Sequence, residues 1–213
     1  MDPGTLSTST YADLVELGRR LYEHSLVRRE DEEITDPRGK PIGWLLDTRV
    51  PMLDGDVFGE VGAVLAERMR AKGHRQVAGY GFGAFSIVCS VLDAEGPDVG
   101  GDGVADAADD TLAFKGGFIR KERKGHGRQR LVEGPISRDE PVVLVDDILN
   151  SGRSATRAVA LLREEGFEVA GLMTLFSFTW SSGRTRLEAD GLWVDSLLDL
   201  NLREGGRSNN DSL

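Results

Sequence analysis

The sequence predicts an α/β protein with a central, mostly parallel, twisted sheet and helices on both faces. Helical and strand-like segments alternate along most of the chain. Residues 142–145 (Val-Val-Leu-Val) are apolar without alternation, which is typical of a strand buried on both faces. Glycine-rich or acidic loops follow two of the expected strands, and ligands of such sheets bind in loops at the carboxyl ends of strands.

The individual elements follow from the spacing of apolar residues. Recurrence every three or four positions predicts a helix, and a short apolar run between turn residues predicts a strand. The expected helices cover residues 10–22, 57–72, 85–92 and 154–165, and the expected strands cover 76–79, 112–114, 117–119, 141–145, 168–176 and 193–196. Residues 10–202 are expected to form one domain, and the polar ends 1–9 and 203–213 are expected to be disordered.

Composition restricts the classes of function. The 213 residues carry a net charge of -10, which argues against a nucleic-acid binder. No apolar run is long enough for a membrane span and no secretory signal is visible, so a cytoplasmic protein is expected. Residues 93–110 hold seven acidic side chains and no basic one, which predicts a solvated loop. Cys89 is expected to be buried and inert, and His24 and His74 are expected on the surface.

Two acidic residues and a polar loop follow the apolar strand at residues 141–145. Asp146 and Asp147 come first, and the residues that open the next helix are Asn150, Ser151, Gly152, Arg153 and Ser154. Backbone N–H groups at a helix start attract anions, and glycine lets a phosphate approach closely. The carboxylates would lie where the hydroxyls of the attached sugar lie. The segment predicts a ribose 5-phosphate site, with an Asp-Asp turn and a helix cap as the alternative.

A glycine-rich loop and a basic loop precede this segment. The first consists of Tyr80, Gly81, Phe82 and Gly83, a pattern that ordinary turns share. The second, at residues 118–127, reads Phe-Ile-Arg-Lys-Glu-Arg-Lys-Gly-His-Gly. Cations in a mobile loop can stabilise a departing pyrophosphate when substrate is bound, although a solvated basic turn is the alternative. A P-loop NTPase is excluded, because its Gly-x-x-x-x-Gly-Lys-Ser/Thr pattern is absent from the sequence.

In this order, the three loops resemble those of type I phosphoribosyltransferases. The basic loop is similar to the Arg-Lys-Glu-x-Lys-x-His-Gly loop of orotate phosphoribosyltransferases, and Asp47-Thr48-Arg49 resembles their Asp-x-Arg. The resemblance spans about residues 10–200. It implies an added small N-terminal hood, formed by about residues 10–50 and 175–200. It also implies transfer of a phosphoribosyl group from 5-phosphoribosyl-1-pyrophosphate (PRPP) to a nitrogenous base, with release of pyrophosphate and inversion at the anomeric carbon.

The resemblance implies residue roles as well. The catalytic residues would be Lys121, Lys124, His126, Asp146 and Asp147. The residues binding PRPP and its phosphates would be Arg120, Tyr80, Gly81, Phe82, Gly83, Asn150, Ser151, Gly152, Arg153 and Ser154. Mg²⁺ would be the cofactor, held mostly by water and by the pyrophosphate and ribose oxygens of PRPP, and Asp146 and Asp147 could contact it through water. A homodimer is expected, in which the basic loop acts on the neighbouring subunit, with no nucleic acid or membrane as partner.

The acceptor site departs from the family pattern. Phe178-Thr179 stands where the family has Asp-Arg, and residues 35–40 replace its Lys-Ser-Gly hood motif. Other side chains near these positions are Arg184, Arg186, Arg38, Lys40, Trp44 and Trp180. We therefore expect the PRPP half of the site to be kept and the acceptor half to be rebuilt, which leaves open whether orotate is the acceptor. A PRPP- or nucleotide-binding regulator of the same fold is the alternative.

Overall fold

A six-stranded sheet forms the centre of the protein. The computed structural model describes residues 8–36, 38–94, 113–122 and 130–201, with the backbone alone for residues 8–12. The strand order is β5-β4-β3-β6-β7-β8, and all neighbouring pairs are parallel except β4 with β5. The strands are β3 (Gln76–Tyr80), β4 (Lys115–Ile119), β5 (Val132–Glu133), β6 (Val142–Leu149), β7 (Val169–Phe178) and β8 (Trp193–Leu200). The predicted mostly parallel sheet is confirmed.

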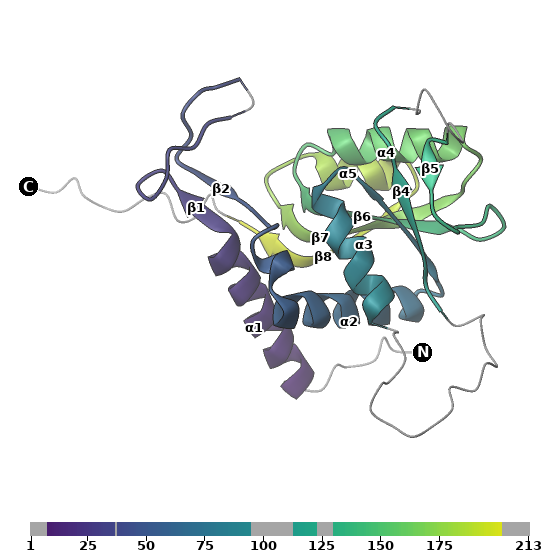
Figure 1. Ribbon diagram of the computed structural model, residues 1–213, viewed down its shortest axis with the longest axis horizontal. Coiled ribbons are helices and arrows are strands. Elements are labelled where there is room, and N and C mark those ends of the chain that lie inside the picture. Colours follow the sequence, from purple (N-terminus) through teal and green to yellow (C-terminus); the bar gives the residue numbers. More distant parts are fainter. Residues whose placement is uncertain (1–7, 37, 95–112, 123–129, 202–213) are drawn as a thin grey trace, which may run out of the picture.

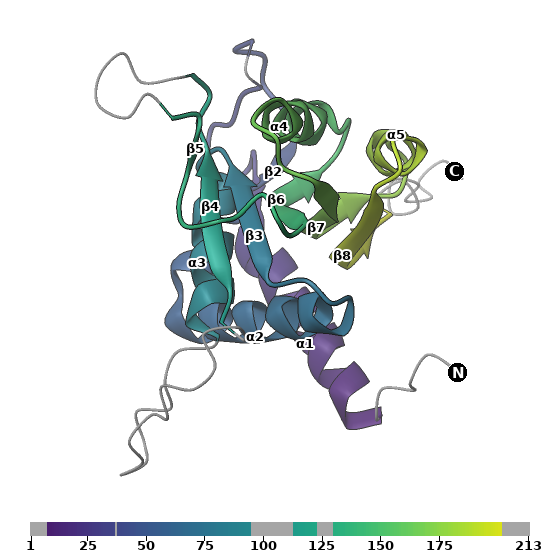
Figure 2. The ribbon, with the colours of Figure 1, turned by 90° about the vertical axis from the view of Figure 1, so that its right-hand side faces the viewer.

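Helices cover both faces of this sheet (Figures 1 and 2). One face carries α1 (Thr8–Ser25), α2 (Gly55–Ala71) and α3 (Gly83–Asp93), and the other carries α4 (Arg153–Glu164) and α5 (Gly183–Ala189). Val143 of β6 packs in the first apolar core and its neighbour Leu144 packs in the second. Successive side chains of a strand point to opposite faces, so an apolar run without alternation fits a strand covered on both sides.

A small antiparallel hairpin forms the hood. It consists of β1 (Leu26–Arg28) and β2 (Trp44–Leu46), and the chain then continues through the 3₁₀ helix η1 (Pro51–Leu53) into α2. The turn at the tip of the hairpin is closed by the Asp36 side chain, which accepts hydrogen bonds from the N–H groups of Arg38 and Lys40. Residues 175–200, also expected to contribute to the hood, form the end of β7, α5 and β8, and β8 contacts α1.

The structure corrects the predicted bounds of two strands. β6 continues beyond Val145 to Leu149, so the two aspartates lie inside the strand and not in the following loop. Its pairing with β7 carries on through Asp146 opposite Thr174, which keeps this part of the backbone extended. Residues 113 and 114 are the described part of the strand expected at residues 112–114, and they precede β4 without belonging to a strand. The Phe114 ring packs beneath two guanidinium groups, those of Arg70 and Arg75.

Several other expectations are also corrected. α3 begins at Gly83 and not at residue 85, and α4 begins at Arg153 and not at residue 154. His74 is half-buried against Trp193, and burial lowers its pKa, whereas His24 is exposed as expected. Cys89 is half-buried, and this burial raises the pKa of its thiol. Among the described helices, none combines the length and apolarity needed to cross a membrane.

Candidate functional site

The carboxyl ends of the parallel strands bring the predicted loops to one edge of the sheet. The register pairs Tyr80 at the end of β3 with Ile119 at the end of β4, and β6 lies on the other side of β3. The loops that follow these strands therefore share an edge, which is the usual ligand site of such sheets. Residues 47–50, which leave the hood, also reach this edge, because Thr48 contacts Asp147.

Asp146 and Asp147 form the polar centre of this edge. The backbone N–H of Asp147 donates to Asp146 Oδ1 over 3.0 Å. Asp147 Oδ1 accepts from the N–H of Ile148 over 2.9 Å, and Asp147 Oδ2 accepts from the Thr48 hydroxyl over 3.0 Å. Burial, helped by the neighbouring Asp147 carboxylate, raises the pKa of Asp146 to about 8. The surroundings of Asp146 therefore disfavour its charged form.

A pocket of about 290 Å³ opens beside Asp147, between the hood and the connection from β3 to α3. Its lining residues are Leu45, Leu46, Asp47, Thr48, Arg49, Phe82, Gly83 and Asp147. A Cβ atom at Gly83 would lie 2.4 Å from Asp147 Oδ2, so glycine is what allows α3 to begin against this carboxylate. Of the sequence-predicted residues, the structure thus brings Phe82, Gly83 and Asp147 together around one cavity.

The loop after β6 turns sharply into α4. Gly152 has a φ of 72° and caps the helix, so the N–H groups of the first turn of α4 face the same edge. Ser181 Oγ donates to the carbonyl of Asn150 over 2.7 Å, and Arg186 donates to the carbonyl of Ser151 over 2.9 Å. A Cβ atom at Gly183 would lie only 2.1 Å from the Asn150 carbonyl oxygen. The segment that follows β7 therefore holds the loop between β6 and α4 in place.

The basic loop is described only at its start. Arg120 follows β4, its N–H donates to the Leu131 carbonyl, and its guanidinium lies 3.5 Å from the Glu133 carboxylate. Lys121 is exposed to solvent. Lys124 and His126 lie outside the described residues. The structure thus places Arg120 and Lys121 at the site's edge without bringing either into the pocket beside Asp147.

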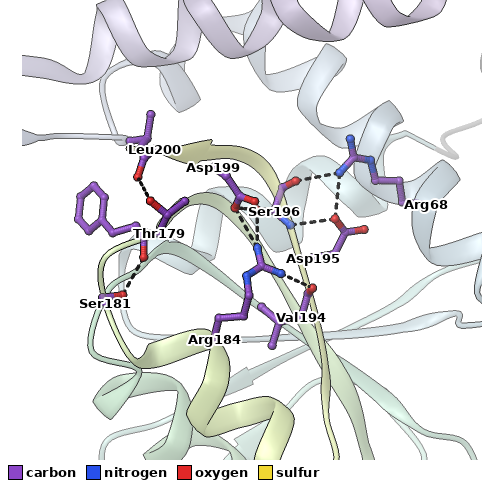
Figure 3. A network of polar contacts seen from close by, with 10 residues as sticks. Arg68, Thr179, Ser181, Arg184, Val194, Asp195, Ser196, Asp199 and Leu200 are labelled. Carbon is purple, nitrogen blue, oxygen red and sulfur yellow. Dashed lines mark hydrogen bonds and ion pairs between the residues drawn. The ribbon is translucent and has the colours of Figure 1, made fainter. Parts of the chain in front are cut away.

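The arginines near the expected acceptor site are held by other parts of the protein (Figure 3). Arg184 donates to the Val194 carbonyl, to Ser196 Oγ and to Asp199 Oδ1 over 2.7, 3.1 and 2.9 Å. Thr179, at the position where the family has arginine, is fixed by hydrogen bonds to the Leu200 carbonyl. The hydrogen bonds of Arg184 therefore stabilise β8, and the hydrogen bond of Arg186 stabilises the loop after β6.

Three aromatic rings join the hood to the core. Phe178, at the end of β7, stacks on Trp180 with 4.6 Å between the ring centroids. Trp44 of β2 meets the edge of Phe178 at 6.1 Å and keeps 38% of its surface exposed. Packing is thus the observed role of the two tryptophans, and Trp44 retains an accessible part.

The described residues offer few metal ligands. No group of three or more His, Cys, Asp or Glu side chains that could hold a metal occurs among them. The site does contain one pair of neighbouring carboxylates, those of Asp146 and Asp147. Carboxylates are hard oxygen donors of the kind that Mg²⁺ prefers. A larger groove of about 370 Å³ lies between α1 and α2, but apolar side chains line much of it and neither aspartate reaches it.

The contact of Thr48 with Asp147 is the feature that sequence reasoning missed. The two residues are 99 positions apart, and nothing in the local pattern of either segment signals that they meet. The only available signal was the resemblance of residues 47–49 to a family motif, which marks the segment and not the contact.

Comparison with known proteins agrees with this geometry. Residues 96–201 match the model of the phosphoribosyl transferase domain. An orotate phosphoribosyltransferase of Corynebacterium glutamicum is 30% identical over 200 residues, which cover 94% of this chain and 97% of the relative. A Bacillus mycoides orotate phosphoribosyltransferase is 36% identical over 99 residues, covering 46% of this chain and 47% of the relative.

Solved structures show the same likeness. The Mycobacterium tuberculosis orotate phosphoribosyltransferase in complex with Fe(III) dicitrate superposes with a TM-score of 0.71 at 26% identity, covering 88% of this chain and 97% of that one. The adenine phosphoribosyltransferase of Thermoanaerobacter pseudethanolicus, at 18% identity and a TM-score of 0.56, shares the fold, with 87% of this chain and 99% of that chain covered. These relatives do not favour a binding-only regulator. The chain belongs to the orotate phosphoribosyltransferase family and is a PRPP-dependent phosphoribosyltransferase.

Proposed function

We propose that the site beside Asp147 transfers the 5-phosphoribosyl group of PRPP to a ring nitrogen of a base. The bond between the anomeric carbon and the pyrophosphate oxygen breaks, and a bond to the nitrogen forms on the opposite side of the sugar. In this proposal Asp146 and Asp147 hold the ribose hydroxyls, and the loop at residues 150–154 holds the 5-phosphate. Pyrophosphate leaves along the Gly81–Gly83 loop.

One observation carries this assignment. The carboxylates of β6 and the positive-φ turn at Gly152 lie on the same continuous segment, five residues apart, at the carboxyl edge of the sheet. A diol-binding pair next to an anion-binding helix start matches the two ends of a phosphoribosyl group. The basic loop would add positive charge as pyrophosphate departs, with Arg120, Lys121, Lys124 and His126 as the contributing residues.

Mg²⁺ fits this site as a cofactor shared with the substrate. The two carboxylates cannot complete a six-oxygen shell, so water and the oxygens of PRPP would supply most of the ligands. When bound, the ion would neutralise charge on the pyrophosphate. The raised pKa of Asp146 fits this arrangement, since a positive ion nearby would lower it again.

We infer that the acceptor is held by aromatic packing and shape more than by an ion pair. Arg184 and Arg186 both donate to other groups of the protein, and Thr179 cannot pair with a carboxylate as a guanidinium does. The exposed part of Trp44 offers a face or edge for a base. A base without a carboxylate is therefore the preferred acceptor, with orotate as the competing choice.

We also propose that the chain acts as a homodimer. Exposed apolar side chains occur in and next to η1 and at the start of α3, and this apolar rim consists of Val50, Leu53, Phe82 and Phe85. Leu53 is 82% exposed and Phe82 is 77% exposed, while η1 packs on α3 and Phe82 lines the pocket itself. Large apolar side chains exposed on neighbouring elements are typical of an interface. In this proposal a second copy bound at this rim supplies its basic loop to the site.

The test is a screen of bases with PRPP and Mg²⁺, in which pyrophosphate release is measured. Orotate and uracil form a matched pair, because they differ by the carboxylate alone. We expect release with at least one base, and faster release with uracil than with orotate. Preference for orotate would contradict the inferred acceptor class, and PRPP binding without release for any base would contradict catalysis.

A further inference from the structure

Thr48 lies at the point where the hood meets the paired carboxylates. It is 2% exposed, and its hydroxyl donates to Asp147 Oδ2 over 3.0 Å. A buried hydroxyl that donates to a carboxylate is a directional contact, stronger than one between neutral groups. Thr48 therefore does more than pack between two elements, because its hydroxyl also binds a carboxylate.

The backbone around Thr48 is held firmly. The N–H of Met52 donates to the Thr48 carbonyl over 3.1 Å, and the N–H of Asp47 donates to the Ser25 carbonyl over 2.7 Å. On the next residue, the Arg49 guanidinium pairs with both carboxylate oxygens of Asp47, each over 2.6 Å. These bonds fix the backbone from which the Thr48 side chain reaches Asp147.

The Asp147 carboxylate is enclosed on several sides. The N–H of Ile148 binds Oδ1, Thr48 binds Oδ2, and Gly83 lies so close to Oδ2 that even a Cβ atom there would overlap with it. The hydroxyl of Thr48 is the one side-chain donor among these contacts. It therefore sets the direction in which the remaining lone pairs of the carboxylate point.

We propose that Thr48 is a positioning residue, whose hydroxyl holds the Asp147 carboxylate in the orientation that receives the ribose hydroxyls of PRPP. This inference rests on the proposed function of the site. It also gives the hood a part in PRPP binding. Residues 47–50 follow the hairpin, and through Thr48 they contact the carboxylate that would bind the ribose. A correctly oriented carboxylate lowers the cost of ordering the site when PRPP arrives.

The test compares Thr48→Val with Thr48→Ser by calorimetric titration with PRPP in the presence of Mg²⁺. Valine keeps the shape and removes the donor, whereas serine keeps the donor. We expect Thr48→Val to weaken PRPP binding about tenfold, since it removes a hydrogen bond to a charged group. We expect Thr48→Ser to bind within about twofold of the wild type, and circular dichroism to show that both variants are folded.

A double-mutant cycle with Asp147→Asn separates positioning from general packing. If Thr48 acts through Asp147, the added effect of Thr48→Val on PRPP binding should largely vanish in the Asp147→Asn background. Full additivity, equal losses in the valine and serine variants, or wild-type affinity in Thr48→Val would each overturn the proposal. Absence of PRPP binding by the wild-type chain would instead overturn the proposed function on which it rests.

Discussion

At the scale of single residues, the site places two neighbouring carboxyl groups, Asp146 and Asp147, in a partly buried part of a strand. Asp146 sits beside Asp147 in a strand that packs on both faces, and burial raises the pKa of Asp146 to about 8. A group whose charged form is disfavoured in this way reduces stability at neutral pH. Such a cost is expected where a carboxylate is kept for binding and not for folding.

Asp146→Asn should therefore stabilise the fold, and more so as the pH rises. Below pH 3.8 both states of the wild type hold the proton. Between that pH and about 8 the unfolded chain releases it while the folded chain keeps it, so the free energy of unfolding falls by up to about 1.4 kcal/mol per pH unit. Urea unfolding of both proteins at pH 5, 6, 7 and 8 should show a gap that widens in favour of the variant; parallel curves would contradict it.

Gly83→Ala should weaken PRPP binding while leaving the protein folded. The added Cβ would lie 2.4 Å from Asp147 Oδ2, so the carboxylate must rotate and lose its bond to Thr48. We expect a loss of about tenfold or more in the affinity for PRPP. Gly59→Ala in α2 is the matched control, because a Cβ there has open space around it. Equal affinities in the two variants would show that the contact at Gly83 does not matter.

At the scale of elements, length decided what the sequence could predict. The long helices and buried strands such as α2 and β6 gave clear periodic or apolar patterns, and they form as expected. Strands β1, β2 and β5 have three residues or fewer and α5 has seven, so none offers enough positions for a pattern. The boundary of β6 was misjudged because acidic residues rarely continue a buried strand, whereas pairing with β7 carries it on to Leu149.

The segment from β7 to α5 should control the loop that binds the 5-phosphate. Gly183→Ala would force a Cβ atom to 2.1 Å from the Asn150 carbonyl oxygen, a backbone atom that can yield only by moving its loop. We expect a loss of about 1–3 kcal/mol in the free energy of unfolding, together with weaker PRPP binding. Gly59→Ala again serves as control and should retain or raise stability, since alanine is preferred within a helix. Denaturant unfolding and PRPP titration measure both effects, and unchanged values for Gly183→Ala would refute this role.

At the scale of the whole molecule, the fold class was predictable because apolar patterns mark its main helices and strands, and the proposed donor site was predicted from one continuous segment. The apolar strand, its two aspartates and the following helix start are all encoded within residues 142–154. The hood contacts were not predictable, since Thr48 and Trp44 meet Asp147 and Phe178 only after the chain has folded. The acceptor site depends on such long-range contacts, which is why the sequence left its ligand open.

The proposed dimer makes a prediction about mixed subunits. Asp147→Asn should disable the core of a site while leaving its basic loop intact, and Lys124→Ala should do the reverse. If each loop serves the neighbouring subunit, a mixed dimer contains one site built from two intact parts. Equal mixing after random exchange should then restore about a quarter of the wild-type sites, whereas loops acting within their own subunit restore none. Pyrophosphate release is the readout, with each variant alone as the baseline.

Adding Leu53→Asp on the apolar rim to both variants should weaken the dimer in sedimentation and abolish the restored activity. Recovery that persists in monomers would exclude the shared site.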